Sequence, residues 1–517
     1  MSDGSESRYA QQMGEAQVAD VIISGAGPVG LWLAAELRLA GATVTVLEKR
    51  THRSTHSRAQ TLHARTLEIF ASRGIVGPWL DEGIEIPTTH YAMLSSRLDL
   101  TGLQSDFPFV LFLPQVRTEE LLEQYAVELG VQVLRGMEVI QIASTPDGVR
   151  ATARGVTAGD TAAIVELAGR FLVGCDGRRS TVRAASGIGY TGTEDTLTCV
   201  MGDVCLDDDT PPAMTLHSAA GSFYGVRIDS TRHRLVGLEH ATMTTSRDIP
   251  LSLEELRDTI KRITGRDFGM RDPSWLTRVG SATFQADHYR QGRTLLAGDA
   301  AHVHFPMGGQ GLNLGVADAM NLGWKLGAVL RSDAPDALLD TYEQERAPVG
   351  RAVIDDTLAQ TAIIAVTGRE GQALRGMMTA ALAENAALNA KFALFASGTN
   401  VSYPPGAAPA HPLVGRRVPN LALSGGPDVF GLLRDAQFGV VGIAADALAS
   451  RLRPDALTRL SLAPGGFAGA RGPWDGVGAA LIRPDGHLAW AADRESGVDV
   501  GAEAAAALLR WLPGLGR

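Results

Sequence analysis

Three glycines near the N-terminus have the spacing of a phosphate-binding turn. They form the pattern Gly25-x-Gly27-x-x-Gly30, between an apolar run, "VADVIIS", and a segment with helical spacing, "LWLAAELRLAG". The first glycine makes the bend, the second lets the backbone approach a pyrophosphate, and the third allows close helix packing. The helix N-terminus then offers free N–H groups and a positive dipole to the phosphates. The pattern predicts dinucleotide binding; the alternative is a tight turn whose glycines serve only packing.

An acidic residue at the end of the next predicted strand supports dinucleotide binding. Glu48 ends the alternating run "ATVTVLE", eighteen residues after Gly30. A carboxylate at this place can accept hydrogen bonds from both hydroxyls of an adenosine ribose, which favours FAD or NAD over NADP. The sequence has no second GxGxxG. A nicotinamide would therefore visit a site dominated by another cofactor.

Two further acidic residues lie at predicted strand ends. Asp176 is in "VGCDGRRSTVR" and Asp299 is in "LLAGDAAH". The first segment alone is also compatible with an acidic turn followed by a solvated basic helix. The second continues as "GDAAHVHFPMGGQGLNLG", residues 298–315, which suggests a metal site, a flexible loop or a backbone cradle for an anion.

The backbone cradle is the preferred interpretation of residues 298–315. A metal site on His302 and His304 would need an extended segment and further ligands, and the chain has no HExxH or Cys/His cluster. We therefore predict no metal. Gly308, Gly309 and Gly311 permit close approach, and a helix from about residue 312 would present unpaired N–H groups.

Composition and charge exclude several classes of protein. The chain has 517 residues and a formal net charge of -10, which argues against nucleic acid as a partner. Its three cysteines are few for this length and form no CxxC, and such an odd, sparse set fits a reducing cytosol better than a disulfide framework. The polar N-terminus lacks the apolar core of a signal peptide. The sequence has no run of about 18 apolar residues, so no membrane span is predicted. A cytoplasmic protein is expected.

The predicted fold class is α/β with an inserted α+β region. A βαβ unit begins near residue 19, amphipathic helices are predicted over 59–73 and 117–129, and strand-like segments dominate 185–285. The predicted organisation is a disordered tail (1–18), a Rossmann-like dinucleotide-binding domain in two parts (19–184 and 286–395), an inserted sheet-rich domain (185–285), a linker (396–412) and a C-terminal domain (413–517).

The three motifs together, in this order and spacing, resemble those of the class A flavoprotein monooxygenases, the para-hydroxybenzoate hydroxylase superfamily. The segment "SRAQTLHARTLEIFASRGI" and the C-terminal unit are similar to one branch, the bacterial aromatic polyketide hydroxylases and rifampicin-oxidising relatives. In that branch the C-terminal unit is thioredoxin-like; here it has no cysteine, which leaves a structural role.

The resemblance implies tightly but non-covalently bound FAD and a set of cofactor contacts. Asp176 would support the FAD cleft and the passage of the nicotinamide, and Asp299 would bind the ribityl chain. The amides near Leu312 would face the flavin ring, and the Pro306 carbonyl would lie near the reacting centre. The other implied cofactor-binding residues are Gly25, Gly27, Pro28, Gly30, Glu48, Lys49, Arg58, Gln115, Gly309, Gly311 and Asn313, with Arg117 a weaker neighbour.

The resemblance also implies a reaction. NADPH or NADH, as a transient co-substrate, would reduce FAD, and a flavin C4a-hydroperoxide formed with O2 would hydroxylate a phenolic, polycyclic aromatic. No side-chain nucleophile is needed. The substrate pocket is expected between flavin and sheet-rich domain, with Phe223, Tyr224, His240 and His304 as candidate lining residues. Baeyer–Villiger oxygenation, antibiotic inactivation and non-catalytic ligand binding stay open, as do substrate identity and a monomeric or homodimeric state.

Overall fold

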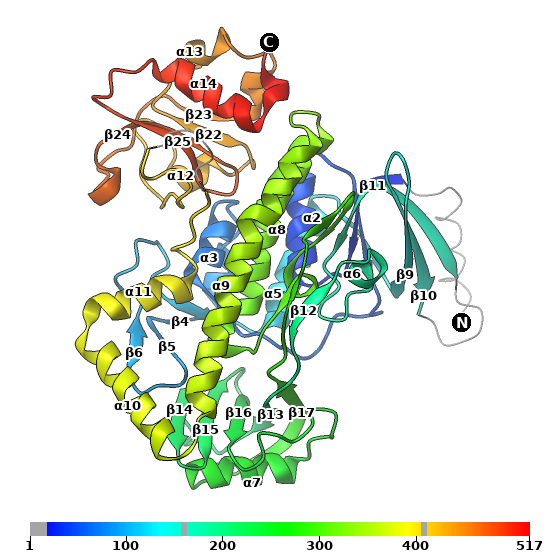
Figure 1. Ribbon diagram of the computed structural model, residues 1–517, viewed down its shortest axis with the longest axis vertical. Helices are drawn as coiled ribbons and strands as arrows, with labels where there is room; N and C mark the ends of the chain where they lie inside the picture. The colour runs from blue at the N-terminus through cyan, green and yellow to red at the C-terminus, as the bar shows by residue number, and fades with distance from the viewer. Residues whose placement is uncertain (1–17, 157–162, 212, 405–410) are drawn as a thin grey trace.

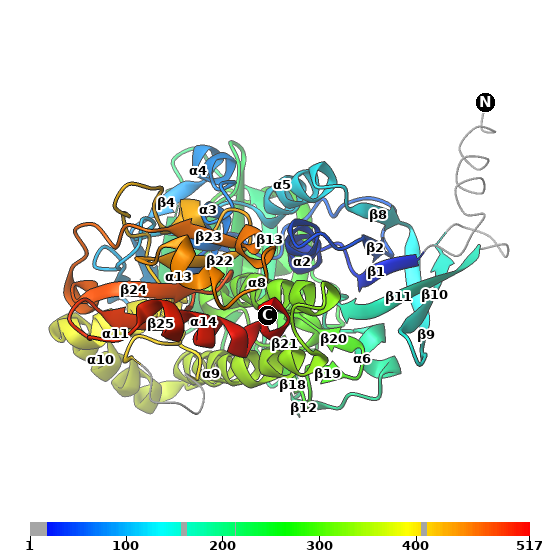
Figure 2. The ribbon, with the colours of Figure 1, turned by 90° about the horizontal axis from the view of Figure 1, so that it is seen from above.

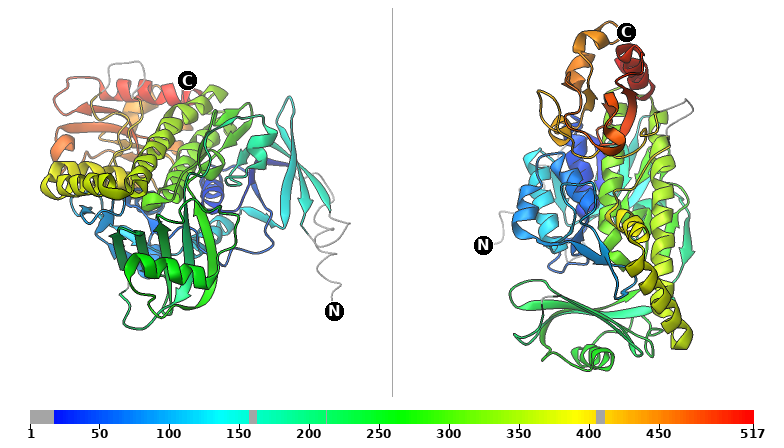
Figure 3. Two further views of the ribbon diagram at one scale, coloured as in Figure 1. Left: turned by 60° about the horizontal axis from the view of Figure 1, so that its bottom comes forward. Right: turned by 90° about the vertical axis from the view of Figure 1, so that its left-hand side faces the viewer.

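The computed structural model describes residues 18–156, 163–211, 213–404 and 411–517. Residues 1–17 of the predicted tail and 405–410 of the predicted linker therefore lie outside the described residues. The chain forms an α/β fold around one large sheet, with a five-stranded sheet and a C-terminal unit at opposite ends (Figures 1 and 3). Within the described residues, no helix has the length and apolar character needed to cross a bilayer.

The large sheet has the strand order β19-β20-β11-β1-β2-β8, and β9 and β10 extend it from β11 as an antiparallel hairpin. Neighbours among β20, β11, β1, β2 and β8 are parallel, so their carboxyl ends share one edge. Such an edge is where ligands bind in open α/β sheets. The strands are β1 (Val18–Ser24), β2 (Val44–Glu48), β8 (Gln132–Arg135), β9 (Met137–Ser144), β10 (Val149–Gly155), β11 (Ile164–Gly174), β19 (Arg290–Gln291) and β20 (Thr294–Leu296).

Helices α2 (Pro28–Leu39), α5 (Gln115–Glu128) and α8 (Gln310–Leu330) pack together beside this sheet (Figure 2). Most of α8 is buried, because it lies between α2 and α9 (Asp340–Ala365). It begins at Gln310, two residues before the predicted start. The shorter helices of this part are α4 (Gly77–Glu82) and α6 (Thr181–Ala185).

The helix predicted over 59–73 is shorter than expected. It is α3 (Ala64–Ala71), and the residues before it form strand β3 (Thr61–Leu62), which pairs with β7 (Val110–Phe112). Pairing with a strand fifty residues away is a long-range effect that local helical spacing cannot reveal. The remaining short strands are β4 (Ile84–Ile86), β5 (Thr88–His90), β6 (Arg97–Asp99), β12 (Tyr190–Thr193), β18 (Thr283–Ala286) and β21 (His302–Val303).

The five-stranded sheet is antiparallel, in the order β14-β15-β16-β13-β17, and one face is covered by α7 (Leu253–Thr264). Ser252 caps α7 by accepting a hydrogen bond from the Glu255 N–H, and Gly265 ends it in a left-handed conformation. Beyond α9, helices α10 (Gly368–Glu384) and α11 (Ala386–Ser397) follow. The strands are β13 (Thr198–Cys205), β14 (Ala213–Ser218), β15 (Gly221–Arg227), β16 (Arg232–Glu239) and β17 (Arg271–Gly280).

The C-terminal unit has a four-stranded mixed sheet, β23-β22-β24-β25, as expected for a thioredoxin-like fold. It packs against α8, where the Trp324 ring meets the rings of Phe438 and Trp511 edge-on at 5.5 and 5.8 Å. The elements are β22 (Phe438–Val441), β23 (Leu460–Ala463), β24 (Val477–Ile482), β25 (Leu488–Asp493), α12 (Val429–Leu432), α13 (Ala445–Ala449) and α14 (Val500–Trp511).

Candidate active site

The glycine turn between β1 and α2 has the geometry that the sequence predicts. Gly25 has φ +107°, and a Cβ there would collide with the Cys175 carbonyl; a Cβ at Gly30 would collide with the Gly25 carbonyl. A Cβ at Gly27, by contrast, would meet nothing within 4 Å. Gly27 is the N-cap of α2, and no side chain caps this end of the helix. The uncapped N–H groups at the start of α2 therefore face an open space. Pro28 is the first residue of the helix.

Glu48 lies beside this turn at the end of β2. Its Oε2 accepts a hydrogen bond from the Ala26 N–H at 2.9 Å, and its Oε1 accepts one from the Arg50 N–H at 2.9 Å. These bonds fix the carboxylate, and each oxygen keeps a further lone pair for a ligand hydroxyl. Lys49 is exposed next to it.

Arg58 and Gln115 are brought together, although 57 positions separate them. Gln115 begins α5; its Oε1 accepts from the Ala59 N–H at 2.9 Å, and its own N–H donates to the Ala59 carbonyl at 3.0 Å. Arg58 is thereby held at the surface beside the N-terminus of α5. Arg117 points elsewhere, because its guanidinium pairs with Glu82 and Glu120.

Asp176 follows β11 at the same edge of the sheet. Its Oδ2 accepts from the Val182 N–H at 3.1 Å, and within the described residues its buried Oδ1 has no partner. Burial raises the pKa of this carboxyl group above its usual value. The same loop meets the third motif, since Arg183 donates to the Ala300 carbonyl at 2.8 Å.

We predict that Asp176→Asn stabilises the protein at pH 7. A raised pKa in the folded state means that the ionised carboxylate destabilises the fold. The gain in the free energy of unfolding from Asp176→Asn is therefore full above the raised pKa. It disappears as the pH falls to about 3.9, the usual pKa of an aspartate. Thermal unfolding between pH 3.5 and 8 measures this, with the exposed Asp258→Asn on α7 as the control. A gain that does not change with pH would contradict the assignment.

Asp299 lies at the end of β20, in the 3-10 turn η1 (Gly298–Ala300). It is exposed, and within the described residues its carboxylate has no hydrogen-bond partner. Across from it, a Cβ on Gly311 would stand 4.0 Å from Asp299 Oδ1 and 3.7 Å from His304 Nε2. The acid therefore faces the first turn of α8 with its lone pairs free.

The start of α8 is the backbone device that residues 308–313 predict. Gly308 and Gly309 have φ +70° and +67°, and Gly309 is the N-cap without a side-chain cap. The N–H groups through Leu312 precede the first intrahelical bond, whereas Asn313 is the first position that can reach back to the N-cap carbonyl. Pro306 is exposed just before this turn.

The Asn313 side chain holds the neighbouring segment in place. Its Oδ1 accepts from the His63 N–H at 2.8 Å and from the Thr66 hydroxyl at 2.7 Å, and its Nδ2 donates to the Thr61 and Gly309 carbonyls. The side chain is therefore a clamp between α8 and the β3–α3 segment.

The two histidines of the third motif differ in their surroundings. His302 is buried, and its Nε2 lies 2.6 Å from Asp318 Oδ2, while Asp318 Oδ1 accepts from Arg346 at 2.7 Å. His302 is thus committed to a buried ion-pair network. His304 lies at the loop, where its Nδ1 contacts the Phe305 carbonyl and burial lowers its pKa, so its ring is neutral at pH 7.

The suggestion that Phe223 lines the substrate pocket is wrong. It is fully buried and stacks on Phe268 in the core beneath α7. Tyr224 lies on the other face of the sheet, 6.1 Å from the His90 ring between centroids. His240 joins β16 to the end of α9 through contacts of its ring nitrogens with the Ala219 and Ile364 carbonyls, both at 3.2 Å.

Arg234 is a further candidate site residue, which the sequence did not indicate. It forms a buried pair with Asp203 through two bonds of 2.7 Å, and it also reaches the Arg58 carbonyl at 3.3 Å. The two partners lie directly opposite each other on β16 and β13. Asp203 is the one charged residue of β13 and was the only signal for this pair, because β16 also carries Arg232, His233 and Glu239.

These groups fit a flavin dinucleotide. The open Gly27 turn and Glu48 suit an adenosine diphosphate, unpartnered Asp299 suits a polyhydroxy chain, and the free N–H groups of α8 suit a ring that becomes negative. All of them lie at the carboxyl edge of the large sheet or face it.

Comparisons with known proteins agree with this fit. The family model described as "FAD binding domain" matches residues 18–357, and the model "Aromatic-ring hydroxylase, C-terminal" matches 411–514. The Bacillus subtilis protein named "Uncharacterized aromatic compound monooxygenase YhjG" is 39% identical over 480 residues, which are 92% of this chain and 94% of that protein.

Two antibiotic-related proteins are also similar over nearly their whole length. Rifampicin monooxygenase of Streptomyces venezuelae is 36% identical over 492 residues, covering 92% of this chain and 96% of its own. The solved structure of the anhydrotetracycline hydroxylase OxyS from Streptomyces rimosus has a TM-score of 0.85 at 37% identity, and covers 96% of this chain and 99% of its own. The chain therefore belongs to the FAD-dependent aromatic-ring hydroxylases, a class of flavoprotein monooxygenases.

Proposed function

We propose that this chain hydroxylates a phenolic, polycyclic aromatic of the polyketide type, with NADPH or NADH as reductant and O2 as oxidant. The observation that carries the proposal is the position of the unpartnered Asp299 and the uncapped start of α8 beside an apolar cluster. The names of the similar proteins, which concern tetracycline- and rifampicin-type compounds, support the substrate class.

FAD, when bound, supplies the electron transfer and the oxygen activation of the reaction. We assign its ADP half to the glycine turn with Pro28, and to Glu48 and Lys49. Arg58 and Gln115 would lie near the pyrophosphate, Asp176 would line the path of the nicotinamide, and Asp299 would accept hydrogen bonds from the ribityl hydroxyls.

The chain would stabilise negative charge at the flavin ring through the backbone. The N–H groups of Gly309, Gly311 and Leu312 lie at the positive end of a 21-residue helix. His304 is neutral at pH 7 and adds no fixed charge there. Such fixed dipoles need no reorganisation during reaction.

The substrate would lie between Pro306 and the face of the five-stranded sheet that carries Tyr224. The neighbours of Pro306 in the chain, Phe305 and Met307, are buried in one apolar cluster with Leu98 and Leu238. An apolar wall next to a few polar groups is the usual character of a site for a flat aromatic ligand.

The proposal predicts that polycyclic phenols accelerate NADPH or NADH oxidation by the yellow, FAD-loaded protein. A panel of naphthols, hydroxyanthraquinones and tetracyclic phenols, with simple phenol as a control, measures the acceleration and the product mass. Ring-hydroxylated products support hydroxylation, and a lactone would instead indicate Baeyer–Villiger oxygenation. If every phenol binds but none accelerates oxidation, the chain is a non-catalytic binder and the proposal is wrong.

Monomeric or homodimeric assembly and residence in the cytoplasm complete the proposal. The low cysteine content supports a reducing compartment. Size-exclusion chromatography with light scattering would give the assembly state.

A further inference from the structure

A second internal space lies on another face of α8 from the candidate flavin site. It is a cavity of about 460 Å³ between α3, α8, α9, residues 397–404 and the C-terminal unit. Gln310, Asn313 and Ala317 line it with helical spacing, whereas Gly311 faces His304 and Asp299. The first turn of α8, clamped by Asn313, therefore separates the two places.

The cavity has the size and lining of a small-molecule site. Its volume falls within the range of about 300–1,000 Å³ that ligand pockets have. Its walls are mainly apolar, with Ile69 from α3, Leu314 from α8, Val349 from α9, Phe395 from α11 and Val401 from the segment after α11. An apolar, flat molecule would fit such walls.

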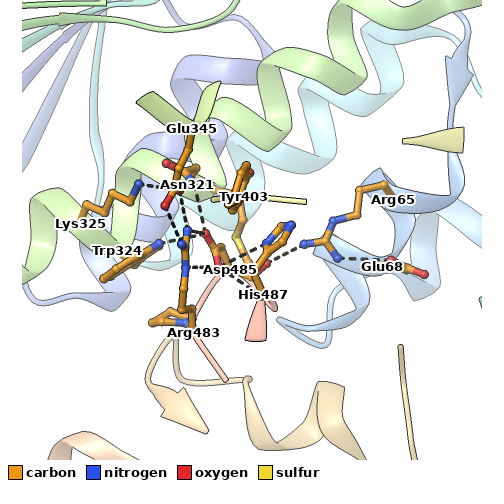
Figure 4. Close-up of polar contacts among 12 residues, drawn as sticks. Arg65, Glu68, Asn321, Trp324, Lys325, Glu345, Tyr403, Arg483, Asp485 and His487 are labelled. Carbon is orange, nitrogen blue, oxygen red and sulfur yellow. Dashed lines mark hydrogen bonds and ion pairs between the residues drawn. The ribbon is translucent and has the colours of Figure 1, made fainter. Parts of the chain in front are cut away.

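The charges at one end of the cavity already have partners (Figure 4). Arg483 forms two bonds to Glu345, at 2.7 and 2.8 Å, and also bonds to Asp485, while Lys325 donates to Glu345 at 2.8 Å. Although burial opposes it, Arg483 and Lys325 hold the pKa of Glu345 at about 2. An ionic ligand would find no free counter-charge among these groups and would lose its hydration.

Two buried imidazoles that line the cavity carry nitrogens without partners among the described residues. They are His63 Nδ1 and both ring nitrogens of His487. Burial lowers the pKa of both histidines to about 4, so both are neutral at pH 7. Buried polar atoms without partners are uncommon in folded proteins and call for an explanation.

The polar neighbours of the two rings indicate that His63 Nδ1 and His487 Nε2 are acceptors. The His63 ring lies near the Gly308 carbonyl, which favours its proton on Nε2, since Nδ1 has no partner among the described residues. His487 Nδ1 lies 3.4 Å from Asp485 Oδ1, which favours the proton on Nδ1 and leaves Nε2 as the acceptor. The Tyr403 ring lies 4.2 Å from the His487 ring and holds it in place. A ligand that satisfies both nitrogens must donate, as a hydroxyl group does.

We propose that this cavity is a second ligand site, which binds an uncharged, hydroxylated polycyclic aromatic and is separate from the flavin site. Binding at this site requires no electron transfer, so the site is additional to the proposed reaction. The residues that line the cavity are the evidence for it.

Equilibrium dialysis of the FAD-loaded protein with 1-hydroxypyrene tests the proposal. Ala352 lines the cavity and is exposed on α9, so Ala352→Phe would fill the opening with little risk to folding. Ala359→Phe, exposed on the same helix and outside the cavity, is the matched control. We expect Ala352→Phe to bind one equivalent fewer than the wild type and the control. Equal stoichiometry in all three, or no binding to the wild type, would overturn the proposal.

A second variant tests the hydrogen-bond acceptor. His487→Phe keeps an aromatic ring beside Tyr403 and removes the acceptor, so 1-hydroxypyrene should bind about tenfold more weakly while pyrene binds as before. Pyrene-1-sulfonate should not bind in the cavity, so the wild type and Ala352→Phe should bind equal amounts of it. An unchanged affinity of His487→Phe for 1-hydroxypyrene would contradict the proposed ligand chemistry. Less pyrene-1-sulfonate bound by Ala352→Phe than by the wild type would also contradict it. The readout is bound ligand, so it is independent of whether the enzyme oxygenates any substrate.

Discussion

Asp299→Ala protein is expected to lose most of its FAD during purification, and its Kd for FAD should rise about 10- to 100-fold. The reason is that hydrogen bonds to a charged group contribute about 1.5–3 kcal/mol each, and among the described residues the exposed carboxylate has no partner that could replace a ribityl hydroxyl. Absorbance at 450 nm relative to 280 nm gives the occupancy, and fluorescence titration gives the Kd.

The same substitution should leave the fold nearly unchanged, since it breaks no hydrogen bond of the described residues. Asp258→Ala, an exposed aspartate on α7 far from the sheet edge, serves as the control for loss of one negative charge. Full flavin occupancy in Asp299→Ala would show that the assigned contact does not exist.

Two glycine substitutions in the first motif should separate cofactor binding from folding. Gly27→Ala places its methyl group in open space at an extended backbone position, so stability without FAD should change by less than about 1 kcal/mol. FAD affinity should nevertheless fall sharply, because the methyl group occupies the approach of the pyrophosphate.

Gly30→Ala should behave in the opposite way. Its methyl group would collide with the Gly25 carbonyl, so the protein without FAD should be destabilised by about 3 kcal/mol. Urea unfolding of both variants, with and without FAD, measures the difference. If Gly27→Ala binds FAD as the wild type does, the open space is not a phosphate site.

Much of the candidate site was predictable from the sequence, because its acidic residues stand at the ends of predicted strands. Glu48, Asp176 and Asp299 each follow a short β-rich run, and parallel strands place such ends at one edge. The glycines at 25, 30 and 309 were predictable for a similar reason, since their backbone angles or close contacts exclude a side chain. These are local signals that need no knowledge of the rest of the chain.

Features that depend on long-range packing were not predictable. Strand alternation indicates that Phe223 and Tyr224 face opposite sides of their sheet, but not which side α7 covers. The Arg234–Asp203 pair requires the register of two strands about thirty residues apart. Arg483, which reaches Glu345 across 138 positions, shows how the C-terminal unit is tied to the flavin-binding part by buried charges.

Incorporation of oxygen from 18O2 is the decisive test of whether this chain hydroxylates an aromatic ring. The FAD-loaded protein, NADPH and the phenol that best stimulates its oxidation are incubated under 18O2, and the product is analysed by mass spectrometry and NMR. We expect a ring-hydroxylated product in which the new oxygen atom comes from 18O2 and not from water. A product without the label, or NADPH oxidation that only reduces O2 with every phenol tested, would contradict this expectation.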